Sequence, residues 1–463
     1  MAATRKDDPL AEVVDEVVDD VVDAVEDAIE EPERYGARQW SGWILGPGVL
    51  LATLLLPAPA GLSVLGWRTA GAGSLMAIFW ITEAIPIPAT ALLPMVLFPM
   101  LGLAKIGEAT APYANSVIML FLGGFVIALA MQKWGLHRRV AITLIGAMGT
   151  RPRRIILGFL VASAAISMWV SNTATALMML PIATSVVALL PPEARTSSAL
   201  KGFGTALLLS VAYGSTTGGM ATLIGTPPNA LLAGYLNSVY HVDIGFAEWM
   251  LLGVPVTLVT LPVVHFVLTR ISFRLGTADV PGMRALLEAE RARLGRISRG
   301  ELSVAIVFVL TAAGWIFQPI IAKVAPLVSD TTVAIAGAVA LFMIPVDARR
   351  GRFVMDWRAT RPLPWDVLIL FGGGLSLAGM IETHGLSRYL GNLSVGLGWL
   401  PVVVTACVLC FVILMLTELT SNTATAATFL PVVAATAVSL GQNPLLFLIP
   451  AALASNCAFM LPV

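Results

Sequence analysis

A short phrase of small and polar residues occurs twice in an otherwise apolar chain. It reads Ser-Asn-Thr-Ala-Thr-Ala at residues 171–176 and again at 421–426, a shift of 250 positions. Eight of the thirteen residues that begin with each phrase are identical. At the same shift, residues 120–139 and 370–389 share eight of twenty positions. Two stretches with one common shift indicate that the chain is internally duplicated, with one copy of the phrase in each half.

The surroundings of the phrase are those of a membrane protein. Charged residues make up 12% of the chain and apolar residues 57%, and the mean hydropathy is +0.86, whereas soluble domains hold about 25% charged residues. We therefore expect an all-α polytopic membrane protein that does not bind nucleic acid. The apolar segments that could span a bilayer lie at 43–60, 66–82, 89–103, 116–132, 155–190, 200–225, 247–269, 302–321, 331–346, 365–381, 400–440 and 445–463.

Two of these segments are about twice as long as one span and carry the phrase near their centres. In each of them a proline, Pro181 or Pro431, follows soon after the phrase. Polar backbone at membrane depth is tolerated only where it lines a cavity or is buried in protein, and proline bends or stops a helix. We predict that residues 153–190 and 400–440 form re-entrant helical hairpins whose tips carry the phrase.

The distribution of basic residues predicts the orientation. With the N-terminus inside, 24 of the 28 Lys and Arg residues lie on the inner side: in the N-terminal tail and in segments 133–154, 190–201, 270–299 and 349–361. This topology opens the two hairpins to opposite sides, so the halves form inverted repeats. Residues 1–35, which hold thirteen Asp and Glu, would be an acidic cytoplasmic tail, either loosely ordered or a docking helix for a partner.

The chemistry of the phrase favours an anion together with a small cation. Its hydroxyl and amide groups are uncharged donors and acceptors, and helix ends at a hairpin tip add free N–H groups on one side and free C=O groups on the other. An anion without a resident counter-charge needs a bound cation to offset its desolvation. Ser167 and Thr417 lie four residues before each phrase, one helical turn back, and we assign them to cation coordination.

Other polar groups at membrane depth are also candidates. Gly218-Gly219 and the segment Gly225-Thr226-Pro227-Pro228-Asn229 interrupt a further span. Single Ser, Thr or Asn residues in spans usually make hydrogen bonds between helices, but a duplicated Ser-Asn-Thr beside a proline favours a site. Glu418 either tunes the cation site or closes a structural hydrogen bond, and Glu83 and Glu382 are expected at the membrane interface.

These motifs resemble those of the divalent anion/sodium symporter family, the carriers of succinate, fumarate, malate, citrate or sulfate. The resemblance covers residues 40–463. It is carried by the two Ser-Asn-Thr phrases, by Trp80-Ile-Thr-Glu-Ala-Ile-Pro-Ile-Pro88, by Phe121-Leu-Gly-Gly124, by Gly225-Thr-Pro-Pro-Asn229 and by Trp365-Asp366 to Gly374.

The resemblance implies a homodimer in which a scaffold part holds the interface and a transport part moves as an elevator. The implied substrate ligands are Ser171, Asn172, Thr173, Ser421, Asn422 and Thr423, with Thr226 and Pro227. The implied Na⁺ ligands are Ser167, Ser171, Asn172 and Gly218 or Gly219 for one ion, and Thr417 and Asn422 for a second. The expected parts are spans 36–110 (mainly scaffold), the first transport part 111–269, connector and scaffold 270–364, and the second transport part 365–463.

We therefore predict a secondary active carrier in the cell (plasma or inner) membrane that couples Na⁺ entry to uptake of a small di- or tricarboxylate. A Na⁺-independent dicarboxylate exchanger and a sulfate or citrate carrier remain alternatives. An enzyme is not expected, because no His lies near either phrase to serve a hydrolase. The resemblance and the duplication also imply a second Thr-Pro-Pro segment and a last span beyond Val463, which would complete the second Na⁺ site and one wall of the substrate site.

Overall fold

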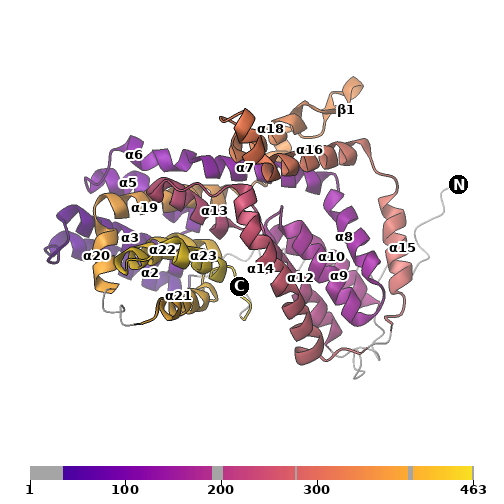
Figure 1. The fold of residues 1–463 in the computed structure, drawn as a ribbon, viewed down its shortest axis with the longest axis horizontal. Coiled ribbons are helices and arrows are strands. Elements are labelled where there is room, and N and C mark those ends of the chain that lie inside the picture. The colour runs from indigo at the N-terminus through magenta and orange to yellow at the C-terminus, as the bar shows by residue number, and fades with distance from the viewer. Residues whose placement is uncertain (1–34, 190–201, 277–278, 395–399, 461–463) are drawn as a thin grey trace. The chain divides into compact units, whose positions relative to one another are not determined.

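The protein is built from helices, several of them apolar enough to cross a membrane. The computed structural model describes residues 35–189, 202–276, 279–394 and 400–460, and most of them are helical (Figure 1). Five helices among these residues are long and apolar enough to cross a membrane: α3 (Val64–Thr82), α7 (Ser116–Lys133), α14 with its π-helical continuation η3 (Phe246–Ser272), α16 (Arg299–Ile316) and α19 (Trp365–Thr383).

The remaining elements are shorter. The other helices of the first half are α2 (Ala37–Leu55), α4 (Ile87–Thr90), α5 (Leu93–Met100), α6 (Ile106–Thr110), η1 (Ala111–Ala114), α8 (Leu136–Met148), α9 (Pro152–Ser167), α10 (Asn172–Ala188), α12 (Phe203–Gly219), α13 (Pro227–Tyr235) and η2 (Leu236–Tyr240). Those that follow are α15 (Met283–Leu294), α17 (Gln318–Val324), α18 (Asp330–Met343), η4 (Ala348–Arg350), η5 (Trp357–Thr360), α20 (Leu386–Ser394), α21 (Val402–Thr417), α22 (Asn422–Ser439) and α23 (Leu445–Ala454). Strands β1 (Pro345–Asp347) and β2 (Arg352–Phe353) form a small antiparallel pair.

Each of the two long broken segments forms a pair of helices with the phrase at the break. Helix α9 ends and α10 begins exactly 250 residues before α21 ends and α22 begins, and both first arms are 16 residues long. Pro181 and Pro431 lie inside α10 and α22 and do not end them. The break is therefore set by the phrase itself, whose Ser is the N-cap residue of the second arm in both copies.

The described residues form two compact units. The first contains residues 131–221 and 253–305, and the second contains residues 35–130, 222–252 and 306–460. Each unit holds one copy of the phrase. How these units relate to the predicted scaffold and transport parts stays a prediction.

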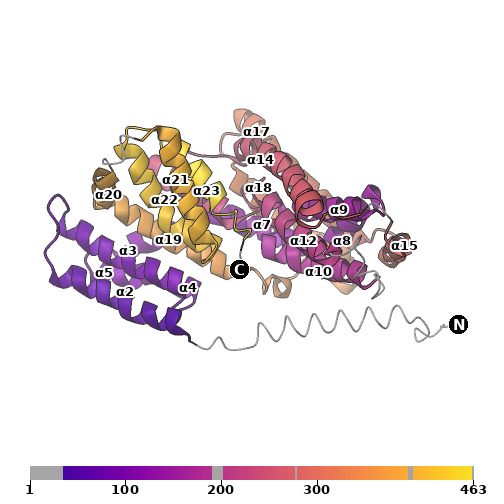
Figure 2. The ribbon, with the colours of Figure 1, turned by 90° about the horizontal axis from the view of Figure 1, so that it is seen from below.

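In the first unit, α9 packs against both α8 and α12, and α10 also lies against α12 (Figure 2). Glycines make the closest approach possible. A Cβ atom on Gly214 would lie 2.6 Å from the carbonyl oxygen of Leu160, and one on Gly218 would lie 2.2 Å from that of Ala164. Such distances exclude any side chain, so α12 touches the backbone of α9 directly, one turn before Ser167.

Ion pairs join α8 to the connector helix α15 and to the start of α16. Arg138 lies 2.5 Å from Glu290, which Arg293 also contacts at 3.1 Å, and Arg139 pairs with the buried Glu301. The hydrogen bond to Glu301 and its negative charge raise the pKa of the Arg139 guanidinium. Because both carboxylates are mostly removed from water, these partners are needed to offset their desolvation. The predicted amphipathic connector thus turns its one buried acid, with Met283 and Leu287, toward the protein.

In the second unit, α19 and α22 form the centre of the packing. Helix α19 contacts η1, α4, α13 and α22, and α22 contacts α20, α13 and α23. A Cβ atom on Gly373 would lie 2.3 Å from the carbonyl oxygen of Ala91, and one on Gly391 would lie 2.8 Å from that of Ala435. The first contact joins α19 to the end of α4, and the second joins α20 to the second arm of the hairpin, which also packs against α19.

Candidate functional site

The first phrase forms a turn that is closed by a side-chain hydrogen bond. The hydroxyl of Ser167, the last residue of α9, donates to the Oδ1 atom of Asn172, the first residue of α10, at 2.8 Å. The side chain of Ser171 caps α10 by accepting from the N–H of Ala174 at 3.4 Å. Ser167 is fully buried, and Thr173 is exposed. The predicted ligands Ser167 and Asn172 are therefore brought into contact.

Gly218 and Gly219 end α12 and are buried in the same unit. The close approach of Gly218 to Ala164 places it one turn from Ser167 on α9. Its carbonyl oxygen accepts the N–H of Ala221 at 3.0 Å and also faces the N–H of Met220. This arrangement gathers most of the residues predicted for the first Na⁺ around one hairpin turn.

The second phrase repeats the contact, but its second acceptor is closer than the Val170 carbonyl, which lies 3.4 Å from the Ser167 hydroxyl, and comes from outside the hairpin. The Oγ1 atom of Thr417, the last residue of α21, lies 2.6 Å from Oδ1 of Asn422 and 2.7 Å from the carbonyl oxygen of Ser455. A hydroxyl has one proton to donate, so the Thr417 hydroxyl faces two acceptors at once. A cluster of one hydroxyl and two carbonyl-type oxygens is what a small hard cation selects.

The segment after α23 was missed by the sequence analysis. Besides the Ser455 carbonyl, the Asn456 side chain accepts from the Thr226 hydroxyl at 2.7 Å and donates to the Asn229 side chain at 3.3 Å. All of these side chains are buried. Thr226 therefore belongs to a polar network inside the second unit, and Pro227, half-buried, begins α13 beside it. The signal that could have found this segment is the polar Ser455-Asn456 pair within the last apolar run.

Glu418 has a structural role in the second hairpin. Its carboxylate accepts the backbone N–H groups of Phe459 and Met460 at 2.9–3.1 Å. Of the two interpretations open from the sequence, these contacts support the structural hydrogen bond. Glu83 pairs with Arg38 at 3.1 Å, and Glu382 accepts from the Ser387 hydroxyl at 2.5 Å.

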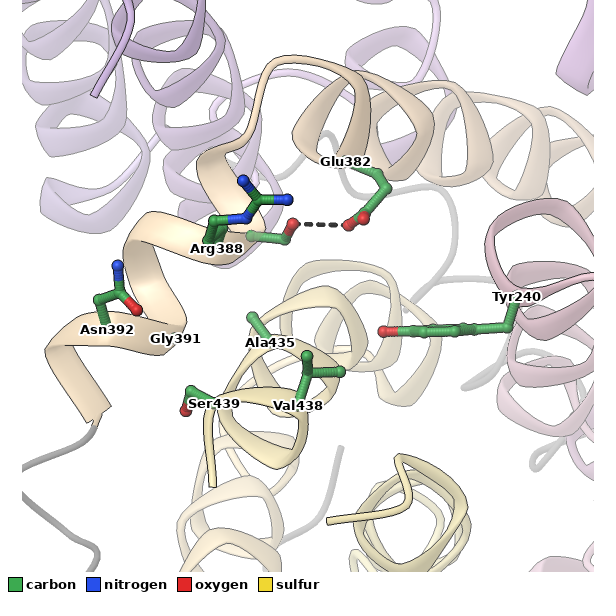
Figure 3. A pocket seen from close by; sticks show the side chains of 9 residues that line it. Tyr240, Glu382, Arg388, Gly391, Asn392, Ala435, Val438 and Ser439 are labelled. Atoms are coloured by element: carbon green, nitrogen blue, oxygen red, sulfur yellow. Dashed lines mark hydrogen bonds between the residues drawn. The ribbon is translucent and has the colours of Figure 1, made fainter. Parts of the chain in front are cut away.

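The second unit contains a polar pocket of about 180 Å³ that is not lined by the second phrase (Figure 3). Tyr240 points into it from η2 and Glu382 from the end of α19, with Arg388 on the neighbouring α20. None of the predicted site residues lines it, so we do not assign it to the transported anion.

The two hairpin turns share one chemistry. Each combines the N-terminus of a helix, whose first N–H groups lack intrahelical partners, with a hydroxyl–amide oxygen pair. No Lys or Arg occurs between Arg154 and Arg195, or after Arg388. Among the described residues, no three His, Cys, Asp or Glu side chains come together to hold a metal. Such turns can bind an anion through N–H and O–H donors and a hard cation through uncharged oxygens. That the two turns form one site stays a prediction from the sequence.

Comparison with known proteins gives a consistent result. Residues 37–463 match the family described as the sodium:sulfate symporter transmembrane region. The chain is 42% identical to the sodium-dependent dicarboxylate transporter SdcS of Staphylococcus saprophyticus over 442 residues, which are 94% of this chain and 85% of that protein. It is 41% identical over 436 residues to SdcS of Staphylococcus aureus, covering 93% of this chain and 84% of that protein.

Proposed function

The chain belongs to the sodium:sulfate symporter family, the family that its motifs resemble, and from that premise we propose that it couples Na⁺ entry to uptake of a small dicarboxylate such as succinate, fumarate or malate. It is a membrane transporter and not an enzyme. The observation that carries the proposal is the repeated hydroxyl–Asn contact, Ser167 with Asn172 and Thr417 with Asn422, at the turn of each hairpin.

Each turn supplies oxygen ligands for one Na⁺. In the second unit the ligands are Thr417, Asn422 and the carbonyl of Ser455, whose oxygens already lie within hydrogen-bond distance of the Thr417 hydroxyl. In the first unit they are Ser167, Ser171 and Asn172, with a carbonyl of Gly218 or Gly219. When Na⁺ binds, the Asn amide oxygen contacts the ion instead of accepting the hydrogen bond from the hydroxyl, which keeps its proton. Broken helices with exposed carbonyls are a recurrent form of Na⁺ site in secondary transporters.

The substrate carboxylates bind at the N-termini of the second arms. Ser171, Asn172 and Thr173 begin α10, and Ser421, Asn422 and Thr423 begin α22. Their first N–H groups carry partial positive charge, and their hydroxyl groups add donors. Thr226 and Pro227, at the start of α13, complete the set that the motifs imply.

The negative charge of the substrate explains why its binding is coupled to that of Na⁺. A dianion held by neutral donors alone, away from water, is unfavourable by several kcal/mol or more, and a bound Na⁺ at the same turn offsets that cost. Asn172 and Asn422 serve both ligands, since the amide oxygen faces the cation and the backbone N–H faces the anion. Substrate therefore binds tightly only with Na⁺ present.

The transport cycle uses alternating access of a homodimer. The equal 250-residue shift of both hairpins and the predicted positions of 24 basic residues on the inner side support inverted repeats with a cytoplasmic N-terminus. Rigid displacement of a transport part against a scaffold, as in an elevator, then exposes the site to either side.

Uptake of radiolabelled succinate into proteoliposomes tests the function. An inward Na⁺ gradient should drive accumulation above the external concentration, and replacement of Na⁺ by choline should stop it. The Asn392→Ala variant, which changes an exposed Asn outside the hairpin turns, is the matched control and should transport like the wild type. Exchange that needs internal dicarboxylate and ignores Na⁺ would replace symport by the exchanger alternative.

A further inference from the structure

A second polar cavity lies in the first unit, where the end of α8 and the start of α9 meet α15. Its volume is about 240 Å³. The wall on the α8–α9 side consists of Gly146, Gly149 and Thr150, and the wall on α15 consists of Arg284, Leu287, Glu288 and Arg291. None of these residues belongs to the hairpin turn or to the ion pairs of Glu290 and Glu301. The cavity therefore has no part in the function proposed above.

The charges around this cavity are mainly positive. Arg284 and Arg291 are seven residues apart on α15, so their side chains share one helix face. The side chain of Arg154 approaches Gly149, with its Cδ atom 3.6 Å from the position of a Cβ there. None of these three arginines forms an ion pair within the described part of the chain, and Arg151 reaches Asp279 only at 3.9 Å. The one acid in the lining is Glu288.

The contrast with the rest of α15 is informative. Arg293, on the same helix, and Arg138 and Arg139, on α8, have carboxylate partners, Glu290 or Glu301. Arg284 and Arg291 instead line the cavity with Gly149 and Thr150, which lie just before α9. The first turn of α9 contains no acid, and its free N–H groups carry partial positive charge. An anion bound among these positive charges would be attracted by all of them. Gly146 leaves room for Arg291, whose guanidinium lies 2.5 Å from the position of a Cβ there.

We propose that this cavity binds a phosphate-type oxyanion, clamped by Arg284 and Arg291 with Thr150 as a further donor. Guanidinium groups bind such oxygens in pairs and strongly. Two sources share this chemistry, the headgroup of an anionic phospholipid and free phosphate. The lipid source agrees with the predicted position of segments 133–154 and 270–299 on the inner side, because basic pockets there recognise anionic headgroups. Because α9 begins next to this cavity and is the first arm of the hairpin that ends at Ser167, an anion bound here would stabilise the start of that arm.

Binding measurements on the full-length protein test this proposal without any transport assay. In detergent, we would compare thermal shifts and native mass spectra with short-chain phosphatidylglycerol, phosphatidylcholine and inorganic phosphate at constant ionic strength. The double variant Arg284→Gln/Arg291→Gln should bind the anion at least about tenfold more weakly. Each charge-assisted hydrogen bond contributes more binding free energy than a tenfold change in Kd requires. The control Arg349→Gln/Arg350→Gln removes two exposed arginines of the second unit and should bind like the wild type.

Each outcome decides the proposal. Selective loss of phosphatidylglycerol binding in the double variant identifies a lipid headgroup, and selective loss of a phosphate-induced shift identifies a soluble oxyanion. Equal loss in the control, or no preference for anionic over zwitterionic lipid in the wild type, overturns it. If the double variant does not fold, Glu288→Gln provides the test: removal of the one acid should strengthen anion binding, and unchanged binding would contradict the site.

Discussion

The two hairpin turns have the same six-residue phrase but different surroundings. In the first, Ser171 caps the second arm, and the hydroxyl of Thr175 is buried without a hydrogen-bond partner. In the second, Thr420 and Thr425 bond each other at 2.6 Å, and the Ser455 carbonyl joins the Thr417–Asn422 pair. The phrase thus encodes the turn and its central contact, while neighbouring residues decide how strongly each turn is supported.

The largest effect is expected where the turns are alike. Asn172→Ala and Asn422→Ala each remove the amide oxygen shared between hydroxyl and cation, so succinate uptake should fall at least about a hundredfold, more than second-shell changes at metal sites usually cause. Initial rates in proteoliposomes, normalised to inserted protein, measure the loss. Wild-type uptake in either variant would mean that its turn lies outside the site.

A smaller effect should separate the two turns. Thr417→Ala removes a hydroxyl that lies within 2.7 Å of two acceptor oxygens and should raise the half-saturating Na⁺ concentration about tenfold. Ser167→Ala removes a hydroxyl whose second acceptor, the Val170 carbonyl, is 3.4 Å away, and should raise it about threefold. Thr417→Ser keeps the hydroxyl and serves as the control. An equal rise in the half-saturating Na⁺ concentration in both alanine variants would contradict the proposed contribution of the Ser455 carbonyl to the second Na⁺ site.

Glu418→Gln tests whether the second turn is supported structurally. Loss of the charge weakens the hydrogen bonds from Phe459 and Met460, which should cost about 1–3 kcal/mol of unfolding free energy and lower the Tm. Half-saturation by Na⁺ should not change. Glu83→Gln, at an exposed ion pair worth at most about 1 kcal/mol, is the control. A shifted Na⁺ dependence with an unchanged Tm would assign Glu418 to the cation site instead.

The smallest effect comes from exchanging the residue before the phrase. Thr420→Val leaves the Thr425 hydroxyl buried without its partner and should lower stability by about 1 kcal/mol. Val170→Thr, the reciprocal change, offers a partner to Thr175 and should leave the Tm unchanged or slightly raised. Thermal unfolding in detergent compares the two. A destabilised Val170→Thr variant would show that the first turn has no room for this hydrogen bond.

Local pattern was sufficient to predict the hairpins. The duplicated phrase and the lengths of the apolar runs predicted both breaks. The one-turn spacing of Ser167 and Thr417 singled out these two hydroxyls as cation ligands but did not predict their contacts with the Asn residues. The prolines were less informative, because α10 and α22 continue through Pro181 and Pro431. Each proline lies near the middle of its helix, where it removes one backbone hydrogen bond, and Ser and Thr hydroxyls can compensate nearby.

Contacts between distant segments could not be predicted in this way. The Ser455 carbonyl contacts the second turn from 38 residues away, and the Asn456 side chain bonds Thr226 and Asn229 across more than 220 residues. They have no duplicated partner in the other half to mark them. A backbone carbonyl ligand can also come from any residue type, so the sequence does not reveal it. The choice between the two roles of Glu418 likewise depended on N–H groups 41 and 42 residues away.

The central claim is that uncharged hairpin turns hold a doubly negative substrate only in the company of Na⁺. Succinate binding to the purified protein, measured calorimetrically across a series of Na⁺ concentrations with choline keeping the ionic strength constant, tests it most directly. The account predicts no measurable binding in choline and an affinity that rises steeply with Na⁺. Equal affinity for succinate with and without Na⁺ would contradict it.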